Sequence, residues 1–367
     1  MHTAQHQDDG WHLRRILMAG GHEHICGGLE IFISRAQACL GIGTHQFTET
    51  PGAGFDSLWR YVLALRNFIR QLRSHDIIWL QYGSVFDLAY LVVAKLFGKT
   101  VVVTPHLGSG WRSMRNGGVR MLCNRLLLLA DVVFTLYESQ PEALRFPPAL
   151  TRRCRVMGTF LPRALLDGEL PSRIPSHPLR LVHVARLSAD KGSFAFLDVC
   201  EALQRRGVAF EATLIGPAGR ETRQALEESI ARRRLTVSIL GALPQADLIA
   251  ALRRYDVLVN LSLQDAYPLT VIEALLCGVV PVCSALPGTI ELAAEAPVIA
   301  LVQGQDGEAA AARIAAIDWT AIPNGADAMR SKFSWTSLSR RYRSAFAELA
   351  AGRRQAPFDK SLKVVTP

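Results

Sequence analysis

Apolar residues in the first half of the chain form short continuous runs that alternate with longer repeats at helical spacing. The runs that predict strands are 16–19, 77–80, 100–104 and 132–136. The repeats that predict helices are 56–73, 87–96 and 119–129. Because strands buried on both faces read as continuous apolar runs, this alternation favours a parallel sheet with helices on both faces.

The alternation stops at residues 161–178, which hold four prolines and no sustained apolar period, so we predict a domain linker there. It then resumes. The second set of predicted strands is 181–185, 212–215, 237–240, 257–261 and 279–282. The second set of predicted helices is 194–205, 221–233, 247–254 and 270–276. We therefore expect two doubly wound α/β domains in tandem, with the ligand site in the cleft between them, at the carboxyl ends of the strands.

Composition narrows the class of protein. The 367 residues are 49% hydrophobic and 20% charged, an ordinary globular balance that excludes a disordered chain and a collagen-like repeat. No uncharged apolar run reaches 18 residues, and the first apolar run is too short for a signal peptide, so we expect a cytoplasmic protein. The seven cysteines include no CxxC pair and no Cys/His cluster, which argues against a structural zinc site.

The net charge of +9, in which 35 of the 41 cations are arginines, favours an anionic partner: nucleic acid, an anionic membrane or a phosphorylated ligand. Residues 57–125 hold ten cations and only Asp76 and Asp87 as acids. Within this stretch, the mixture of Trp, Leu and Arg over 59–73 and over 111–125 suits segments lying on an anionic bilayer, although a solvated arginine face is the alternative. Nucleic acid is less favoured, because no basic-aromatic sheet motif or recognition helix stands out.

Two cations, Arg186 and Lys191, follow the predicted strand 181–185. Arg binds phosphate oxygens bidentately and Lys adds a compact charge, so the pair at a strand's carboxyl end suits a diphosphate. The alternative is a surface arginine and an exposed lysine at the start of a helix.

The segment from Asp265 to Glu273 is the second candidate. Pro268 suits the first turn of a helix, which would leave the backbone N–H groups of Leu269 and Thr270 free to bind phosphate. The carboxylates of Asp265 and Glu273 can accept hydrogen bonds from the vicinal hydroxyls of a ribose or hexose. The alternative is a capping Asp and a solvated Glu.

The first half offers weaker candidates. Gly27 and Gly28 follow the first strand and would let the backbone approach a phosphate or sugar, or would simply form a turn. His106 follows the strand 100–104 and could hydrogen-bond a sugar hydroxyl or stabilise developing charge, or could be a structural loop histidine. No Asp-x-Asp triplet that would hold a divalent metal is present, and no Walker or GxGxxG motif.

Taken jointly, these segments resemble the retaining glycosyltransferases of family GT4, which have the GT-B fold. Gly27 to Glu30 is similar to the GGxE loop of that family, and Thr104 to His106 to its T-x-H. Asp76 to Gln81 is similar to its D-I-I-H-x-H strand, with Gln81 in place of a His. Arg186 to Gly192 resembles G-R-L-x-x-x-K-G, with Ala185 in place of the first Gly. Asp265 to Glu273 resembles E-x7-E, with Asp265 in place of the first Glu.

The resemblance implies a role for each motif. It implies transfer of a hexose from a nucleoside diphosphate sugar to an acceptor hydroxyl with retention, without metal or cofactor, in bacterial polysaccharide or lipid-linked saccharide synthesis. The acceptor would be a saccharide or a lipid-linked saccharide, reached from the inner face of the membrane. The pyrophosphate would be held by Arg186, Lys191 and the N–H groups after Pro268, at Leu269 and Thr270. The ribose would bind Glu273, and the hexose would contact Asp265 with His106 opposite and with Gly27 and Gly28 close by.

The same resemblance divides the chain into an acceptor domain over 1–165 and a donor domain over 166–335. A C-terminal helix over 336–352 would return to the first domain, and 353–367 would be a loose tail. Two other functions remain open: a GT-B enzyme like the nucleotide-sugar epimerases, or a non-catalytic homologue in which the shorter Asp265 marks lost activity. A nicotinamide dehydrogenase would need the glycine fingerprint that this chain lacks.

Overall fold

A computed structural model describes residues 15–21, 28–41, 47–48, 58–108, 115–168 and 175–351. The chain divides into two compact units. Unit 1 takes the described residues up to Leu107, those of 115–160 and those from Trp335 onward. Unit 2 takes Gly108 and the described residues of 161–334. The sequence-predicted division falls at 165/166 and 335/336, and the structure has it at 160/161 and 334/335.

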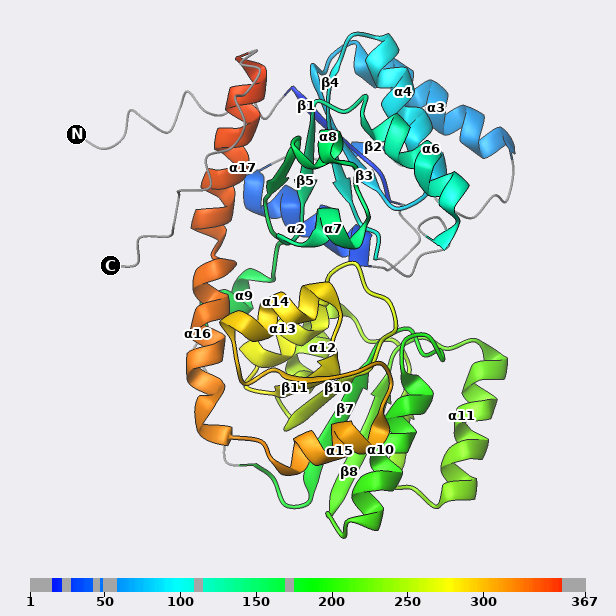
Figure 1. The fold of residues 1–367 in the computed structure, drawn as a ribbon, viewed down its shortest axis with the longest axis vertical. Coiled ribbons are helices and arrows are strands. Elements are labelled where there is room, and N and C mark those ends of the chain that lie inside the picture. The colour runs from blue at the N-terminus through cyan, green and yellow to red at the C-terminus, as the bar shows by residue number, and fades with distance from the viewer. Residues whose placement is uncertain are drawn as a thin grey trace, which may run out of the picture. The chain divides into compact units, whose positions relative to one another are not determined.

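Unit 1 is built on a six-stranded parallel sheet in the order β2-β1-β3-β4-β5-β6 (Figure 1). Its strands are β1 (Ile16–Ala19), β2 (Phe47–Thr48), β3 (Ile77–Tyr82), β4 (Thr100–Pro105), β5 (Val132–Thr135) and β6 (Cys154–Val156). Its longer helices are α2 (Gly28–Leu40), α3 (Leu58–Leu72), α4 (Leu88–Leu96), α6 (Gly117–Leu127) and α17 (Trp335–Ala350). The short ones are η2 (Val85–Asp87), α7 (Gln140–Ala143) and α8 (Pro148–Thr151).

Helices cover both faces of this sheet, because the strand side chains are apolar on both sides. On one face, α4 packs between α3 and α6. On the other, α17 packs beside α2 and carries Tyr342 and Phe346, whose rings lie 5.3 and 5.2 Å from the fully buried ring of Trp79. This aromatic cluster explains why the C-terminal helix belongs to unit 1.

Unit 2 also has a six-stranded parallel sheet, in the order β12-β11-β10-β7-β8-β9. Its strands are β7 (Leu179–Val184), β8 (Phe210–Ile215), β9 (Val237–Leu240), β10 (Val257–Asn260), β11 (Val280–Ser284) and β12 (Ala300–Val302). Its longer helices are α10 (Ser193–Arg205), α11 (Arg220–Arg233), α12 (Gln245–Leu252), α13 (Leu269–Leu276), α14 (Pro287–Glu295), α15 (Gly307–Ala315) and α16 (Ile322–Lys332). The short ones are α9 (Arg163–Leu166) and η3 (Trp319–Ala321).

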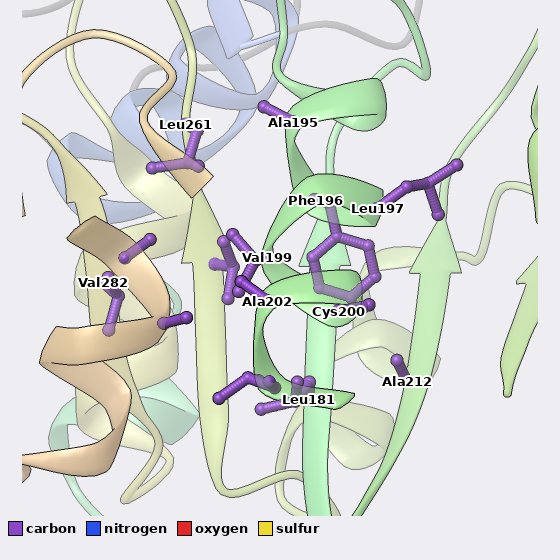
Figure 2. Packing of buried hydrophobic residues seen from close by; sticks show 14 of the residues in the cluster. Leu181, Ala195, Phe196, Leu197, Val199, Cys200, Ala202, Ala212, Leu261 and Val282 are labelled. Atoms are coloured by element: carbon purple, nitrogen blue, oxygen red, sulfur yellow. The ribbon is translucent and has the colours of Figure 1, made fainter. Parts of the chain in front are cut away.

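The core of unit 2 lies between α10 and the centre of its sheet. Figure 2 shows Phe196, Val199 and Cys200 of α10 turned toward the strands, with Leu181 of β7 among the residues beneath them. The apolar positions of α10 recur at helical spacing, so one face of the helix is buried over its whole length. This packing fixes where α10 begins, and its first residue directly follows the loop that carries Arg186 and Lys191.

The prediction of two doubly wound parallel α/β domains is confirmed. In unit 2 the strand order corresponds to 3-2-1-4-5-6, with the reversal between β7 and β10. Within the described residues, no helix is both long and apolar enough to cross a membrane. The predicted loose tail and the predicted site residue Gly27 lie outside the described residues.

Candidate functional site

The point at which the strand order of unit 2 reverses brings two of the predicted motifs together. β7 and β10 are neighbours in the sheet, and their crossovers leave in opposite directions along it. In open α/β sheets, ligands bind at such a point, beyond the carboxyl ends of the strands. Here the loop 185–192 follows β7 and the loop 261–268 follows β10. Arg186 and Lys191 therefore share one edge of the sheet with Asp265.

Lys191 links these two loops directly. Its Nζ donates a hydrogen bond of 2.8 Å to the carbonyl oxygen of Gln264 and lies 3.6 Å from Oδ2 of Asp265. Burial raises the pKa of Asp265, although the positive charge of Lys191 opposes this shift. Arg186 is exposed at the start of its loop. The loops thus hold one cation against a carboxylate and present a second cation to solvent.

The backbones of the two loops are also joined. Leu263 N–H donates to the carbonyl of Asp190 at 2.8 Å, and the Gln264 side-chain amide donates to Oδ2 of Asp190 at 3.2 Å. Gln305, which follows β12, donates to the carbonyls of both Ala189 and Leu261, at 2.8 and 3.0 Å. Sequence reasoning missed Gln305, since a single glutamine after a three-residue strand belongs to no motif.

Gly192, the last residue of the first loop, makes this close approach possible. Its φ is +85°, a conformation that favours glycine, and an added Cβ would lie 2.4 Å from the carbonyl oxygen of Leu261. A side chain at this position would push the two loops apart. The glycine after Lys191 is therefore required by the packing of the two loops.

The start of α13 corrects one expectation. Pro268 precedes the helix instead of occupying its first turn, because its φ of −83° and ψ of 76° place it at the centre of an inverse γ-turn. That turn directs the Leu269 N–H to the carbonyl of Tyr267, at 2.9 Å. The prediction that the Leu269 N–H is free is therefore wrong. Within the described residues, the Thr270 N–H has no backbone acceptor, so it is available to an anion.

Glu273 lies one turn further along α13 and is only 4% exposed. The side-chain amide of Gln245, at the start of α12, donates to its Oε1 at 3.3 Å. The alternative of a fully solvated glutamate is therefore wrong. Gln245 is a further residue that the sequence analysis did not single out.

The two described candidate residues of unit 1, His106 and Gly28, differ in burial. His106 follows β4 and is 8% exposed, and its Nε2 lies 2.9 Å from Oε1 of Gln81. Burial lowers the pKa of His106 to about 3, so the ring is neutral at pH 7. Because a carbonyl oxygen only accepts, Nε2 carries the proton and Nδ1 is left as an acceptor. Gly28 is the exposed first residue of α2, and an added Cβ there would have no atom within 4 Å.

Metal-ligating side chains do not gather in the part of the chain that the structure describes: no group of three His, Cys, Asp or Glu residues lies together there. The six described cysteines form no disulfide, and four of them are buried.

A comparison with protein families finds a match within unit 2. The family model described as "Glycosyl transferases group 1" matches residues 171–317, most of unit 2, including both loops of the site. Over this range the chain is similar to group 1 glycosyl transferases.

Curated relatives of the chain carry glycosyltransferase names. A GDP-mannose:cellobiosyl-diphosphopolyprenol alpha-mannosyltransferase of Xanthomonas oryzae pv. oryzae is 24% identical over 82% of this chain and 80% of its own length. A putative colanic acid biosynthesis glycosyltransferase, WcaL of Escherichia coli, is 32% identical over 46% of this chain and 41% of its own length.

Solved structures show the same fold for this chain. Anabaena Alr3699/HepE, crystallised with UDP and glucose, superimposes with a TM-score of 0.74 at 16% identity, over 91% of this chain and all of that one. Sucrose-phosphate synthase of Thermosynechococcus elongatus gives 0.71 at 19% identity, over 93% and 100%. The chain has the GT-B fold of these structures.

Proposed function

We propose that this protein is a GT4-type glycosyl transferase that moves a hexose, with retention, from a nucleoside diphosphate sugar to an acceptor hydroxyl. The acceptor class is a polysaccharide or a lipid-linked saccharide. The names of the relatives support this class, since they include a mannosyltransferase acting on a diphosphopolyprenol-linked sugar and a colanic acid glycosyltransferase. Two nucleotides occur in the comparisons, GDP in a relative's name and UDP in a structure, so both are candidate donors.

The observation that carries the proposal is the meeting of two loops at the β7–β10 reversal. There the donor's diphosphate would find Lys191, the exposed Arg186 and the N–H of Thr270. Two cations and a helix N-terminus can neutralise a diphosphate without a metal ion. The buried carboxylate of Glu273 would accept hydrogen bonds from the ribose, and Asp265 would contact the hexose.

In the reaction that we propose, the bond between the anomeric carbon and the diphosphate oxygen breaks as the acceptor oxygen bonds to the same face of that carbon. The acceptor's proton passes to the departing diphosphate oxygen. Arg186 and Lys191 stabilise the charge that develops on this leaving group. His106 is neutral at pH 7, so its part is to accept a hydrogen bond from a donor or acceptor hydroxyl through Nδ1, not to supply a proton.

Binding of UDP, GDP and ADP to the wild-type protein and to Lys191→Ala tests this proposal by thermal shift. A nucleotide present at about 100 times its Kd stabilises the protein by roughly 2.7 kcal/mol. We expect one nucleotide to give such a shift and Lys191→Ala to abolish it. Lys332→Ala, which removes a cation from α16 of the same unit, is the matched control and keeps the shift. If none of the three nucleotides shifts the melting temperature of folded wild-type protein, or if the shift persists in Lys191→Ala, the proposed donor site is contradicted.

We also propose that unit 1 binds the anionic inner face of the membrane from the cytoplasm, through the exposed stripe of α3. The stripe consists of exposed residues on one face of α3, followed by an arginine just after the helix ends: Trp59, Val62, Leu63, Arg66, Arg70 and Arg73. Trp59 is 67% exposed, and the helix itself contains no acidic residue. A large aromatic ring next to exposed arginines is the composition of a helix lying in a bilayer interface.

Flotation with vesicles measures this contact. Each arginine near an anionic surface contributes about 1 kcal/mol, so Arg66→Ala with Arg70→Ala lowers binding to phosphatidylglycerol vesicles about 30-fold. The same pair of changes at Arg220 and Arg223, on α11 of unit 2, is the control and leaves binding unchanged. Equal binding to phosphatidylcholine vesicles, or equal loss in both double variants, would reject the α3 stripe.

A further inference from the structure

We propose that His183 and Ser193 are positioning residues for the diphosphate, because together they hold the loop 185–192 from beneath. This inference rests on the proposed donor site. His183 lies on β7 with no exposed surface, two residues before the loop begins, and Ser193 is the buried first residue of α10, directly after the loop ends. Both flank the segment that carries Arg186 and Lys191.

Hydrogen bonds give the buried imidazole one proton arrangement. Nδ1 of His183 lies 2.9 Å from the carbonyl oxygen of Val259 on β10, and a carbonyl can only accept, so Nδ1 carries the proton. Burial lowers the pKa of His183 to about 4, and the charge of Lys191 acts in the same direction, so the ring is neutral and Nε2 is an acceptor. The Ser193 hydroxyl, 3.2 Å away, therefore donates to Nε2.

The Ser193 hydroxyl also links His183 to the backbone of the loop 185–192. Because its proton points to His183, its oxygen is left to accept, and the backbone N–H of Ser188 donates to it at 3.0 Å. Ser188 lies midway between Arg186 and Lys191. A continuous chain of hydrogen bonds thus runs from the loop backbone through Ser193 and His183 to β10, the strand that leads to Asp265.

Packing alone does not require these polar residues. The ring of His183 stacks on Phe196 of α10 at 5.7 Å, a contact that a phenylalanine at 183 would also make, and Figure 2 shows Phe196 within the apolar core there. An apolar pair at 183 and 193 would leave the Ser188 N–H without its acceptor. A buried unpaired N–H is costly, so the loop would move toward water to satisfy it. The hydrogen bonds of His183 and Ser193 therefore keep the loop 185–192 packed against the end of β7.

Ser193→Ala removes a single atom, the hydroxyl oxygen that joins the Ser188 N–H to His183. Ser229→Ala, which changes a buried serine of α11, is the matched control. The probes are UDP and UMP, with GDP and GMP in parallel, by calorimetry at pH 7.5. Displacement of the loop 185–192 weakens binding of the second phosphate but not binding of the nucleoside. We therefore expect the ratio of diphosphate to monophosphate affinity to fall about 10-fold in Ser193→Ala and in His183→Phe, to stay at the wild-type value in Ser229→Ala, and to recover in Ser193→Thr.

The outcomes separate this inference from the proposed function. If wild-type protein binds none of the four nucleotides, the donor site itself is wrong. If it binds a diphosphate but Ser193→Ala keeps the wild-type ratio, or loses UDP and UMP equally, the positioning role is wrong. A measurement that needs no variant is the ¹⁵N spectrum of the His183 imidazole, assigned through its contact with Phe196. Protonation at Nδ1 supports the relay, and protonation at Nε2 overturns it.

Discussion

Asp265 is one of the residues at which the chain departs from the motifs it resembles, with a side chain shorter than glutamate by about 1.5 Å. The structure pairs this shorter side chain with Lys191, 3.6 Å away, in a loop fixed by several backbone contacts.

We expect Asp265→Glu to leave nucleoside diphosphate binding within about twofold of wild type but to lower sugar transfer about 100-fold, since a displacement near 1 Å at the reacting sugar has that effect. Transfer is measured with the donor that the thermal-shift panel selects. A gain of activity would instead identify the chain as a non-catalytic homologue.

At the same scale, the sequence singles out charged candidate residues but not the polar residues that contact their loops. Arg186, Lys191 and Asp265 are recognisable because a cation or carboxylate after a strand has few structural uses. Gln245, Gln305 and His183 are not, because their roles depend on which carbonyl or hydroxyl tertiary folding brings to them. The state of the Leu269 N–H was mispredicted for a local reason, since proline suits an inverse γ-turn as well as a first helical turn.

Among the elements, each predicted strand ends within two residues of the end of an observed strand. A short, continuous apolar run buried on both faces is typical of a strand in a parallel sheet, so its bounds are easy to predict. The strands that were missed, β2, β6 and β12, have two or three residues, too few to show a pattern. Helix α2 was not predicted, because its first residues resemble a glycine loop, although Phe32, Ala36 and Leu40 are buried and recur at helical spacing. Helix α15 buries mainly alanines, which carry little periodic signal.

Two buried neutral histidines, one in each unit, make the stability of the protein depend on pH. His106 and His183 have their pKa lowered to about 3 and about 4 by burial, against 6.5 for an ordinary histidine. Between these values and 6.5 the unfolded chain binds protons that the folded chain excludes. The stability that the neutral rings contribute is therefore complete above pH 6.5 and is lost as the pH falls toward 4 and 3.

We predict that the free energy of unfolding falls by about 2 kcal/mol for each of these histidines between pH 6.5 and pH 5, because each pH unit across which the proton uptake differs changes it by about 1.4 kcal/mol. Urea unfolding at pH 7, 6 and 5 measures this slope. His183→Phe and His106→Phe should each remove about half of it, whatever they do to stability at pH 7, because phenylalanine cannot take up a proton in either state. An unchanged slope in both variants would mean that the two rings are protonated in the folded protein. The Ser193 hydroxyl would then face a donor at Nε2 of His183, and the hydrogen bonds that hold the loop of Arg186 and Lys191 would have to run in another direction.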